Sequence, residues 1–324
     1  MQRNKLLPQD RRTALLGLGG LALAALAGCT SRQSAAADPA ANPDADRALA
    51  EALAALETST GGKFGAAVLD GKDGALVGHR LDERFTMCST FKLSLAAAVL
   101  ARIDAGTIAR DLRLPIGKAD PVGHSPVVRA QLDAGESSMA ILALCEAAQT
   151  QSDNGAANIL LRRIGGPAAL TAFWRSLGDE TSRLDRYEPE LNTSHDGDPR
   201  DSTTAAAMAK SLRAMLTGKT LSPTSRDMLV GWMVATQTGL KRIRGGLPAD
   251  WRAGDKTGTM NGAAYANKTN DIAIIWRPGR AEPFFVTTFL ESDAKGAEGT
   301  RPEDETQIAE VGRIVARWIE SRVA

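Results

Sequence analysis

The chain has 324 residues, of which 43% are hydrophobic and 24% are charged, a length that allows one large globular unit or two smaller ones. Lys and Arg together number 39 and Asp and Glu together number 38, so the formal net charge is +1. The like charges form no long block, which excludes an extended nucleic-acid-binding surface and an acidic tail. This composition favours an enzyme that acts on a small molecule.

The first part of the chain, residues 1–29, resembles an export signal. The basic residues Lys5, Arg11 and Arg12 precede an uncharged stretch of Leu, Ala and Gly from Thr13 to Gly28. This stretch is shorter than the ~20 apolar residues that a membrane-spanning helix needs, so the transmembrane interpretation is the weaker one. We therefore expect the segment to direct export.

The end of this segment, Leu26-Ala27-Gly28-Cys29, resembles a bacterial lipobox, which implies a lipid on Cys29 as the first residue of the mature protein. An ordinary cleaved signal with an incidental Cys is the alternative. The Arg11-Arg12 pair also resembles a twin-arginine signal, and the sequence leaves the export route open. We expect a protein on the periplasmic side that contacts the membrane only through this anchor.

The next segment, residues 30–46, is rich in Ala, Ser, Pro, Asn and Asp and predicts a flexible tether. Folded structure is expected from Arg47, and leucines at helical spacing predict a helix that ends before Gly61-Gly62. Two apolar runs, Phe64–Leu69 and Leu76–Arg80, flank a cluster of turn-forming residues and predict a β-hairpin.

The middle of the chain, from about Thr90 to Thr236, is Ala- and Leu-rich with helical periodicity and contains no convincing strand. Strands are predicted again at Arg252–Thr257, Asp271–Trp276 and Phe284–Leu290, before an amphipathic helix over Asp304–Ser321. Strands near both ends predict a discontinuous α/β domain from residues 47–84 and 240–324. The all-helical domain inserted at residues 85–239 would leave a cleft for a ligand between the two.

Three short motifs carry the candidate chemistry. In Ser89-x-x-Lys92, at the start of a predicted helix, one helical turn brings the lysine amine beside the serine hydroxyl, where a base can activate it. Such a pair occurs by chance about once in a chain of this size, so alone it indicates no more than a solvated helix turn. The second motif is Ser152-Asp153-Asn154, which alone would indicate a polar turn or a helix cap. The third is Lys256-Thr257-Gly258, which alone would indicate the end of a strand.

Together, in this order, the three motifs resemble those of the class A serine β-lactamase family within the penicillin-binding protein superfamily. The similarity runs from about Arg47 to the end of the chain. It implies an antiparallel five-stranded sheet flanked by helices, with an inserted helical domain and the active site in the cleft between them. The run from Arg186 to Asn192 resembles the class A omega loop, about residues 183–201, which penicillin-binding proteins lack.

The resemblance implies hydrolysis of penicillins and cephalosporins, and hence β-lactam resistance, through an acyl-enzyme on Ser89. Glu188 and Asn192 would hold and activate the water that hydrolyses this ester. Whether Lys92 or Glu188 is the base during acylation stays open. Ser152 would pass a proton to the departing lactam nitrogen with help from Lys256.

The remaining roles implied by the resemblance concern binding and support. Asn154 would bind the substrate's side-chain amide, and the backbone N–H groups of Ser89 and Thr259 would form the oxyanion hole. Arg186 and Asp201 would clamp the omega loop. A cationic seat for the substrate carboxylate would come from Lys256, Thr257, Gly258, Thr259 and Arg242. A solvated arginine at a helix end is the alternative for Arg242.

The sequence also departs from the family's pattern. His124 stands where an aromatic residue, often Tyr, is usual, and the hairpin that follows Gly258 is long. Cys88 has no partner at Met260, the position of the bridging Cys in class A carbapenemases, so carbapenem hydrolysis is less expected. We expect Cys88 and Cys145 to be free thiols, although an oxidising compartment would permit them to pair.

Other functions are less well supported. The histidines are scattered and no cluster has metal-ligand spacing, so we expect neither metal nor cofactor. A DD-peptidase-like penicillin-binding protein would form the same acyl-enzyme but would lack Glu188 and Asn192. A β-lactam sensor would need a membrane-spanning helix. We expect a monomer whose partner is a small-molecule β-lactam, with no nucleic acid.

Overall fold

The computed structural model describes residues 42–193, 195, 197–262, 265–292, 294 and 300–323. Its helices are α1 (Pro43–Thr60), α2 (Phe91–Asp104), α3 (Pro126–Asp133), α4 (Ile141–Thr150), α5 (Asn154–Ile164), α6 (Pro167–Ser176), α7 (Ala205–Leu216), α8 (Pro223–Ala235) and α9 (Pro302–Val323). Short 3-10 helices are η1 (Cys88–Thr90), η2 (Glu190–Asn192) and η3 (Ile243–Gly246). The strands are β1 (Lys63–Asp70), β2 (Leu76–His79), β3 (Arg84–Thr86), β4 (Arg113–Pro115), β5 (Ser138–Ala140), β6 (Ser202–Thr204), β7 (Arg252–Met260), β8 (Asn267–Trp276) and β9 (Phe284–Ser292).

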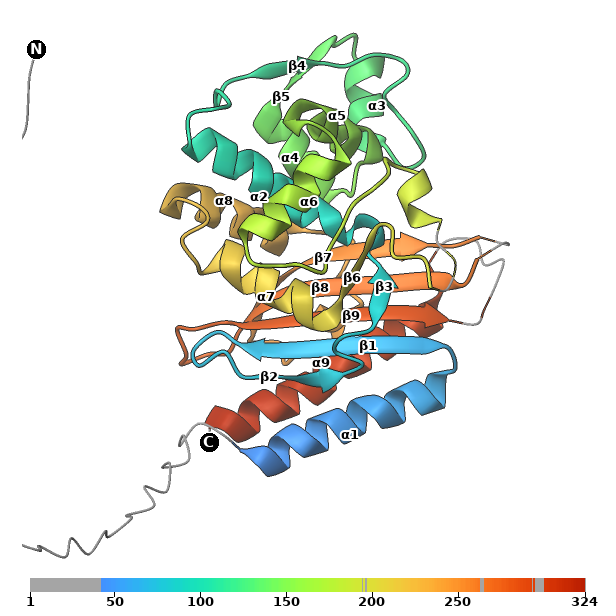
Figure 1. The fold of residues 1–324 in the computed structure, drawn as a ribbon, viewed down its shortest axis with the longest axis vertical. Helices are drawn as coiled ribbons and strands as arrows, with labels where there is room; N and C mark the ends of the chain where they lie inside the picture. The colour runs from blue at the N-terminus through green and yellow to red at the C-terminus, as the bar shows by residue number, and fades with distance from the viewer. Residues whose placement is uncertain are drawn as a thin grey trace, which may run out of the picture. The chain divides into compact units, whose positions relative to one another are not determined.

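The main sheet has five strands in the order β2-β1-β9-β8-β7, and every neighbouring pair is antiparallel. β1 from the first part of the chain pairs with β9 from the last part, from Lys63 opposite Glu291 to Asp70 opposite Phe284. The sheet is thus built from both ends of the chain, with the helical segments inserted between them (Figure 1). The predicted five-stranded antiparallel sheet is confirmed.

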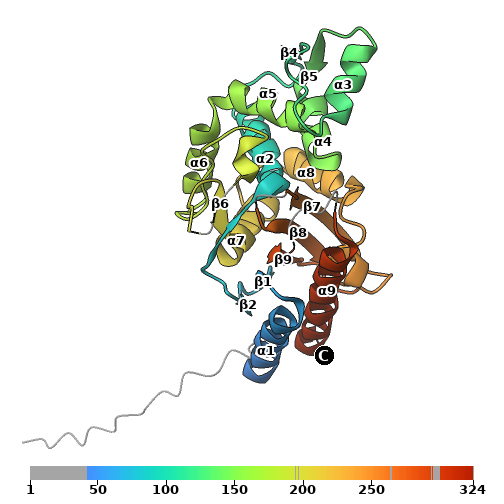
Figure 2. The same ribbon diagram turned by 90° about the vertical axis from the view of Figure 1, so that its right-hand side faces the viewer.

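Helices cover both faces of this sheet. Phe285 and Phe289 of β9 pack in the core shared with α2, α4, α5 and α7, whereas Phe284 and Val286 pack in the core shared with α1 and α9. Successive side chains on a strand point to opposite faces, so burial of both faces explains why the strand is a continuous apolar run. Figures 1 and 2 show α1 and α9 together on one side of the sheet and the other helices on the opposite side.

The expectation that the middle of the chain contains no strand was wrong. β4 pairs with β5, and β6 pairs with β3, which was also missed. Each of these strands has only three residues, too few for an alternating pattern to be read from the sequence. The β3–β6 pair matters for the site, because Met87 N donates to Asp201 O at 3.0 Å just beyond it and ties the chain before Ser89 to the end of the omega loop.

Folded structure also begins earlier than expected. α1 starts at Pro43, within the segment predicted as a tether, and not at Arg47. The Asn42 side chain accepts from Ala45 N at 3.1 Å, and Pro43 occupies the first helical turn, where its missing N–H costs nothing. The export signal, Cys29 and most of the tether lie outside the described residues. Among the helices that the structure describes, none has the length and apolar character needed to cross a membrane.

A buried charge cluster joins the end of β1 to the end of α9. The Asp70 carboxylate pairs with Arg280, and its Oδ2 lies 3.6 Å from Arg322 Nε. The side chains of Asp70 and Arg322 are only 4% and 2% exposed, so water cannot replace a lost partner. Without Asp70, Arg322 would keep Asp73 and Asp46. Among the described residues, Arg280 would keep only Glu282, at 4.0 Å, as an acidic partner, so a buried charge would lose its main partner.

We therefore expect Asp70→Asn to lower the free energy of unfolding by about 3 kcal/mol, measured by urea denaturation. Asn keeps the size and the acceptor for Lys72 N but not the charge. The matched control is Glu310→Gln, which removes an exposed pair with Arg313 and should cost less than about 1 kcal/mol. Equal losses in the two variants would contradict this account.

Candidate active site

Ser89 lies in η1 at the start of α2, where it is half-buried and faces a cleft. Cys88 before it has φ +46°, a region that non-glycine residues rarely adopt, so the turn into the helix is strained. β7 packs directly against this turn. A Cβ on Gly258 would lie 2.6 Å from Met87 O, so only glycine lets β7 pack this closely against the turn. This packing brings Thr259, the next residue of β7, close to Ser89.

The Lys92 ammonium is the centre of a dense set of contacts. Its Nζ donates to Ser89 Oγ at 2.8 Å and to Ser152 O at 2.9 Å. It also donates to Asn154 Oδ1 at 2.5 Å and lies 3.0 Å from Glu188 Oε1. The first and second sequence motifs and the omega loop therefore meet at one buried cation, as the family resemblance implies.

The Glu188 carboxylate lies between the nucleophile and an amide. Ser89 Oγ is 3.3 Å from Glu188 Oε1, and Asn192 Nδ2 donates to Glu188 Oε2 at 2.6 Å. Sequence reasoning missed Asn158 of α5, whose side chain accepts from Glu188 N at 3.0 Å and donates to Glu188 O at 2.9 Å. The Asn158 amide thus bonds both the N–H and the C=O of Glu188, as a neighbouring β-strand would. These two bonds fix the loop backbone and hold the Glu188 carboxylate next to Ser89.

The base of the omega loop is closed by Arg186 and Asp201. Arg186 Nε donates to Asp201 Oδ2 at 2.6 Å, while Asp201 Oδ1 accepts from the backbone N–H groups of Asp185 and Arg186 at 2.7 and 3.0 Å. Asp201 is fully buried. The two residues thus have the contacts expected of a clamp, with the carboxylate bound by three donors.

Ser152 and Lys256 meet on the opposite side of the cleft. Lys256 Nζ donates to Ser152 Oγ at 3.0 Å and to Thr257 O at 2.8 Å. Burial and the nearby Lys92 charge lower the pKa of Lys256 well below its usual value. Asp153 between the two polar motif residues caps α5 and binds the N-terminus of α3, in keeping with the structural role expected for it.

Arg242 precedes η3 and lies against the end of β7. It is 2% exposed, which contradicts the interpretation as a solvated helix-end arginine. Its Nη1 donates to Gly258 O and Asn270 O at 3.0 and 2.7 Å, and its Nη2 donates to Thr259 Oγ1 at 2.7 Å. These bonds hold the guanidinium at the edge of the cleft beside the third motif.

The cleft has a volume of about 380 Å³. Its lining consists of Ser89, His124, Ser152, Asn154, Glu188, Asn192, Thr238, Arg242, Thr257, Thr259 and Thr300. Thr238 and Thr300 were not predicted, because single threonines in loops far apart in the sequence form no motif. Thr238 Oγ1 lies 2.7 Å from Thr257 Oγ1, and the exposed His124 ring bonds Gln151 O at 3.0 Å.

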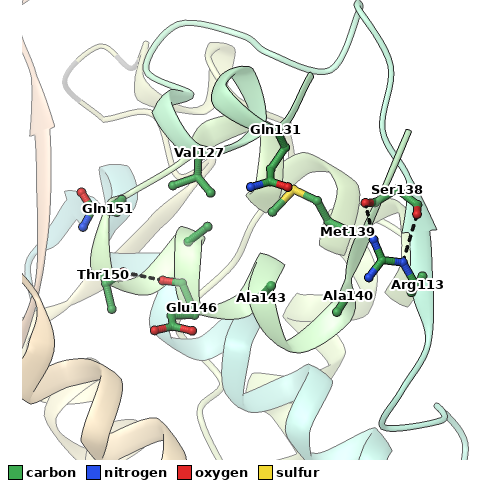
Figure 3. A pocket seen from close by; sticks show the side chains of 11 residues that line it. Arg113, Val127, Gln131, Ser138, Met139, Ala140, Ala143, Glu146, Thr150 and Gln151 are labelled. Atoms are coloured by element: carbon green, nitrogen blue, oxygen red, sulfur yellow. Dashed lines mark hydrogen bonds between the residues drawn. The ribbon is translucent and has the colours of Figure 1, made fainter. Parts of the chain in front are cut away.

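A separate hollow of about 410 Å³ lies among α3, α4 and β5. Its lining includes Arg113, Gln131, Met139, Glu146 and Gln151, and Figure 3 shows Arg113 bonded to Ser138 at its rim. None of the predicted site residues lines it. The converging polar groups belong to the cleft at Ser89, which is therefore the candidate active site.

The cysteines and potential metal ligands contribute no chemistry of their own here. Cys88 and Cys145 are buried free thiols, and burial raises the pKa of Cys88 to about 12, so it stays protonated near neutral pH. In the described part of the chain, no group of His, Cys, Asp and Glu residues could hold a metal ion.

Comparison with known proteins places this geometry in a family. Residues 48–319 match the family described as "Beta-lactamase enzyme family". The chain is 43% identical over 310 residues to Beta-lactamase L2 of Stenotrophomonas maltophilia, covering 95% of this chain and 99% of the relative. It is 45% identical over 249 residues to Beta-lactamase CTX-M-97 of Escherichia coli, covering 77% and 83%.

A solved structure titled "Ancestral (GNCA) Beta-lactamase class A" superposes with a TM-score of 0.76 at 55% identity, covering 83% of this chain and 99% of that one. Similarity therefore extends over the sheet, the inserted helices and the residues around Ser89 alike. The chain belongs to the class A β-lactamase family.

Proposed function

We propose that this protein hydrolyses the β-lactam ring of penicillins and cephalosporins through an acyl-enzyme on Ser89, and so confers resistance to these antibiotics. The observation that carries the proposal is the position of Glu188. Its carboxylate is within 3.3 Å of the Ser89 hydroxyl and is also bonded to Asn192. A base beside both the nucleophile and an amide donor can hold a water against an ester on Ser89.

In the acylation step, Ser89 Oγ attacks the lactam carbonyl and the ring C–N bond breaks. The hydroxyl proton leaves to Glu188 through a water, or to Lys92 after the lysine has passed its own proton to Glu188, 3.0 Å away. The Ser152 hydroxyl, bonded to Lys256, gives a proton to the departing nitrogen. The backbone N–H groups of Ser89 and Thr259 stabilise the oxyanion.

Before deacylation, the proton on Glu188 returns through Lys92 to Ser152, whose Oγ lies 3.5 Å from Lys92 Nζ. Glu188 then removes a proton from water, the resulting hydroxide attacks the ester carbonyl, and the ester C–O bond breaks as Ser89 Oγ takes this proton back from Glu188. A DD-peptidase-like protein would stop at the acyl-enzyme for want of this base. Asn154 binds the substrate's side-chain amide, and His124 borders the same end of the cleft. Every group in this scheme comes from one chain, so the chemistry needs no second copy, and we propose that the enzyme acts as a monomer.

The substrate carboxylate binds beside Lys256, Thr257 and Thr259, with Arg242 behind them. The guanidinium is already oriented by two backbone carbonyls and a threonine hydroxyl, so little freedom is lost when an anion arrives. A buried cation attracts an anion more strongly than an exposed one does. This seat selects ligands that carry an acid next to the lactam.

We expect Glu188→Gln to reduce turnover of a chromogenic cephalosporin about 10³-fold, because the amide cannot accept the water's proton. The acyl-enzyme on Ser89 should accumulate and be visible by intact-protein mass spectrometry. Glu190→Gln, an exposed carboxylate of the same Glu-Pro-Glu run, is the control and should turn over as the unaltered enzyme does. Rapid deacylation in Glu188→Gln would refute the role given to Glu188.

The lowered pKa of Lys256 predicts a pH dependence. A lysine loses its charge as pH rises through its pKa, so the carboxylate seat should weaken at a pH below the usual lysine value of 10.5. KM for a carboxylate-bearing substrate should therefore rise over a pH range that lies below the usual lysine value. In Lys256→Arg the charge persists over this range and KM should stay flat, whatever its absolute value. Parallel profiles for both proteins would count against this assignment.

We also propose export to the periplasmic side and a lipid anchor on Cys29, on the strength of the lipobox-like Leu26-Ala27-Gly28-Cys29 run. Cys29→Ala should move β-lactamase activity from the membrane fraction to the soluble fraction of expressing cells, with total activity measured in both. The unaltered protein in the soluble fraction would instead favour an ordinary cleaved signal.

A further inference from the structure

Two buried carboxyl groups lie side by side beneath the carboxylate seat. Asp255 of β7 and Asp271 of β8 are both fully buried. Asp255 is opposite Ala273 and Thr257 is opposite Asp271, so the two aspartates are diagonal neighbours on one face of the sheet. Asp255 Oδ1 and Oδ2 and Asp271 Oδ1 are buried and, as ionised groups, have no hydrogen-bond partner in the described part of the chain. A hydrogen bond between the two side chains would satisfy these oxygens only with a proton on one partner, because an ionised carboxylate only accepts.

Among the described residues, an arginine forms an ion pair with one of the two carboxylates but not with the other. Arg244 Nε lies 3.2 Å from Asp255 Oδ1. Asp271 Oδ2 accepts from Ile243 N at 3.1 Å, and within the described residues it has no ion pair. Arg242 points its Nη atoms at Gly258, Thr259 and Asn270 instead, and its Nε is 3.6 Å from Glu305 Oε1 of α9.

Burial acts on both carboxyl groups in the direction that favours the protonated form. Burial raises the pKa of Asp255, and burial together with the adjacent Asp255 raises the pKa of Asp271 well above its usual range. The cationic groups facing the pair are Arg242, Arg244 and, from β7, Lys256. Two like charges in contact without water cannot both be retained cheaply.

The pair is also built into the loop that carries Arg242. A Cβ added to Gly239 would lie 1.2 Å from Asp255 Oδ2, so the carboxyl packs on the glycine backbone. Gly239 O in turn accepts from Arg242 N at 2.9 Å. The segment is thus held before Arg242 by contact with Asp255, directly after it by the bond from Ile243 N to Asp271, and next by the Arg244 ion pair.

We propose that Asp255 and Asp271 share a single proton and, as one buried monoanion, act as positioning residues that hold Arg242 in register with the substrate carboxylate. The pair touches no substrate. It acts through the backbone of residues 239–244, which it fixes on both sides of Arg242. This inference rests on the proposed function, in which Arg242 belongs to the seat for the substrate's acid.

Isosteric amides test the shared proton without changing volume. In Asp271→Asn, the amide oxygen still accepts from Ile243 N and the amide N–H still donates to Asp255. In Asp255→Asn, the charge moves to Asp271 and the bond between the two side chains survives. Each single variant should therefore keep KM and kcat for a cephalosporin within about twofold of the unaltered enzyme.

The double variant Asp255→Asn/Asp271→Asn removes the charge altogether. Arg242 then keeps only Glu305 as an acidic partner, and Arg244 has none among the described residues, so the segment should loosen. We expect KM to rise about tenfold with little change in kcat, since only binding of the acid is weakened. The methyl ester of the same cephalosporin lacks the acid, so its KM should be the same for the double variant and the unaltered enzyme. A generally damaged fold would affect both substrates.

Arg242→Ala is the reference and should raise KM for the acid but not for the ester. No turnover by the unaltered enzyme would refute the proposed function itself. Normal turnover by the unaltered enzyme, together with an unchanged KM in Arg242→Ala, would refute the role of Arg242 in binding the substrate carboxylate. It would then refute this proposal as well. With both as expected, an unchanged KM in the double variant would refute positioning by the pair. A KM rise above about fivefold in either single variant would refute the shared proton even if the double variant did not fold.

Discussion

The ion pair between Lys92 and Glu188 is the constraint on which the rest of the site depends. Both side chains are fully buried, with Nζ and Oε1 3.0 Å apart. Removing two charges from water costs several kcal/mol for each charge. Their mutual attraction offsets this cost only when further hydrogen bonds satisfy the remaining donors and acceptors. The neighbouring groups supply these bonds: Ser89, Ser152 and Asn154 accept from the lysine. The residues needed for chemistry are therefore also those that make this buried pair tolerable.

The backbone is strained at three positions around the cleft. Cys88, Ser152 and Asp201 all have positive φ, at +46°, +56° and +53°. Each lies at a junction where a segment must present a group inward: the nucleophile, the second motif's hydroxyl and the clamp of the omega loop. A side chain in this region of φ costs of order 1–3 kcal/mol and persists only where the surroundings over-determine it. The hydrogen bonds at Lys92 and Asp201 provide that surplus of constraints.

Much of this arrangement was predictable from the sequence, and the reason is local. The long strands and helices have apolar periods that survive over many residues. The three motifs are short runs of adjacent residues, so their resemblance to the family's motifs implied the site. The strands of three residues have no such period, and so they were missed. The start of α1 was misplaced because Pro43 and the acidic residues after it are typical both of a tether and of a helix's first turn.

The site residues that were missed share a different property: they act on a partner distant in sequence. Asn158 supports Glu188 across thirty positions. Asp271 supports Ile243 across twenty-eight. In the sequence, Asn158 is one polar residue on an amphipathic helix and Asp271 begins an apolar strand. Only the folded chain shows that the first replaces a strand neighbour and that the second lies against another acid.

This difference also separates the reaction from its selectivity. The groups that we propose to make and break the acyl-enzyme come from short motifs and are fixed by the Lys92 contacts. The cation that we propose for the substrate's acid, Arg242, comes from a loop, and its position is set by β7, β8 and α9 together. A change in any of these three elements can move Arg242 without touching Ser89. Substitutions of buried residues in the sheet can therefore change substrate preference, while the contacts around Lys92 remain the same.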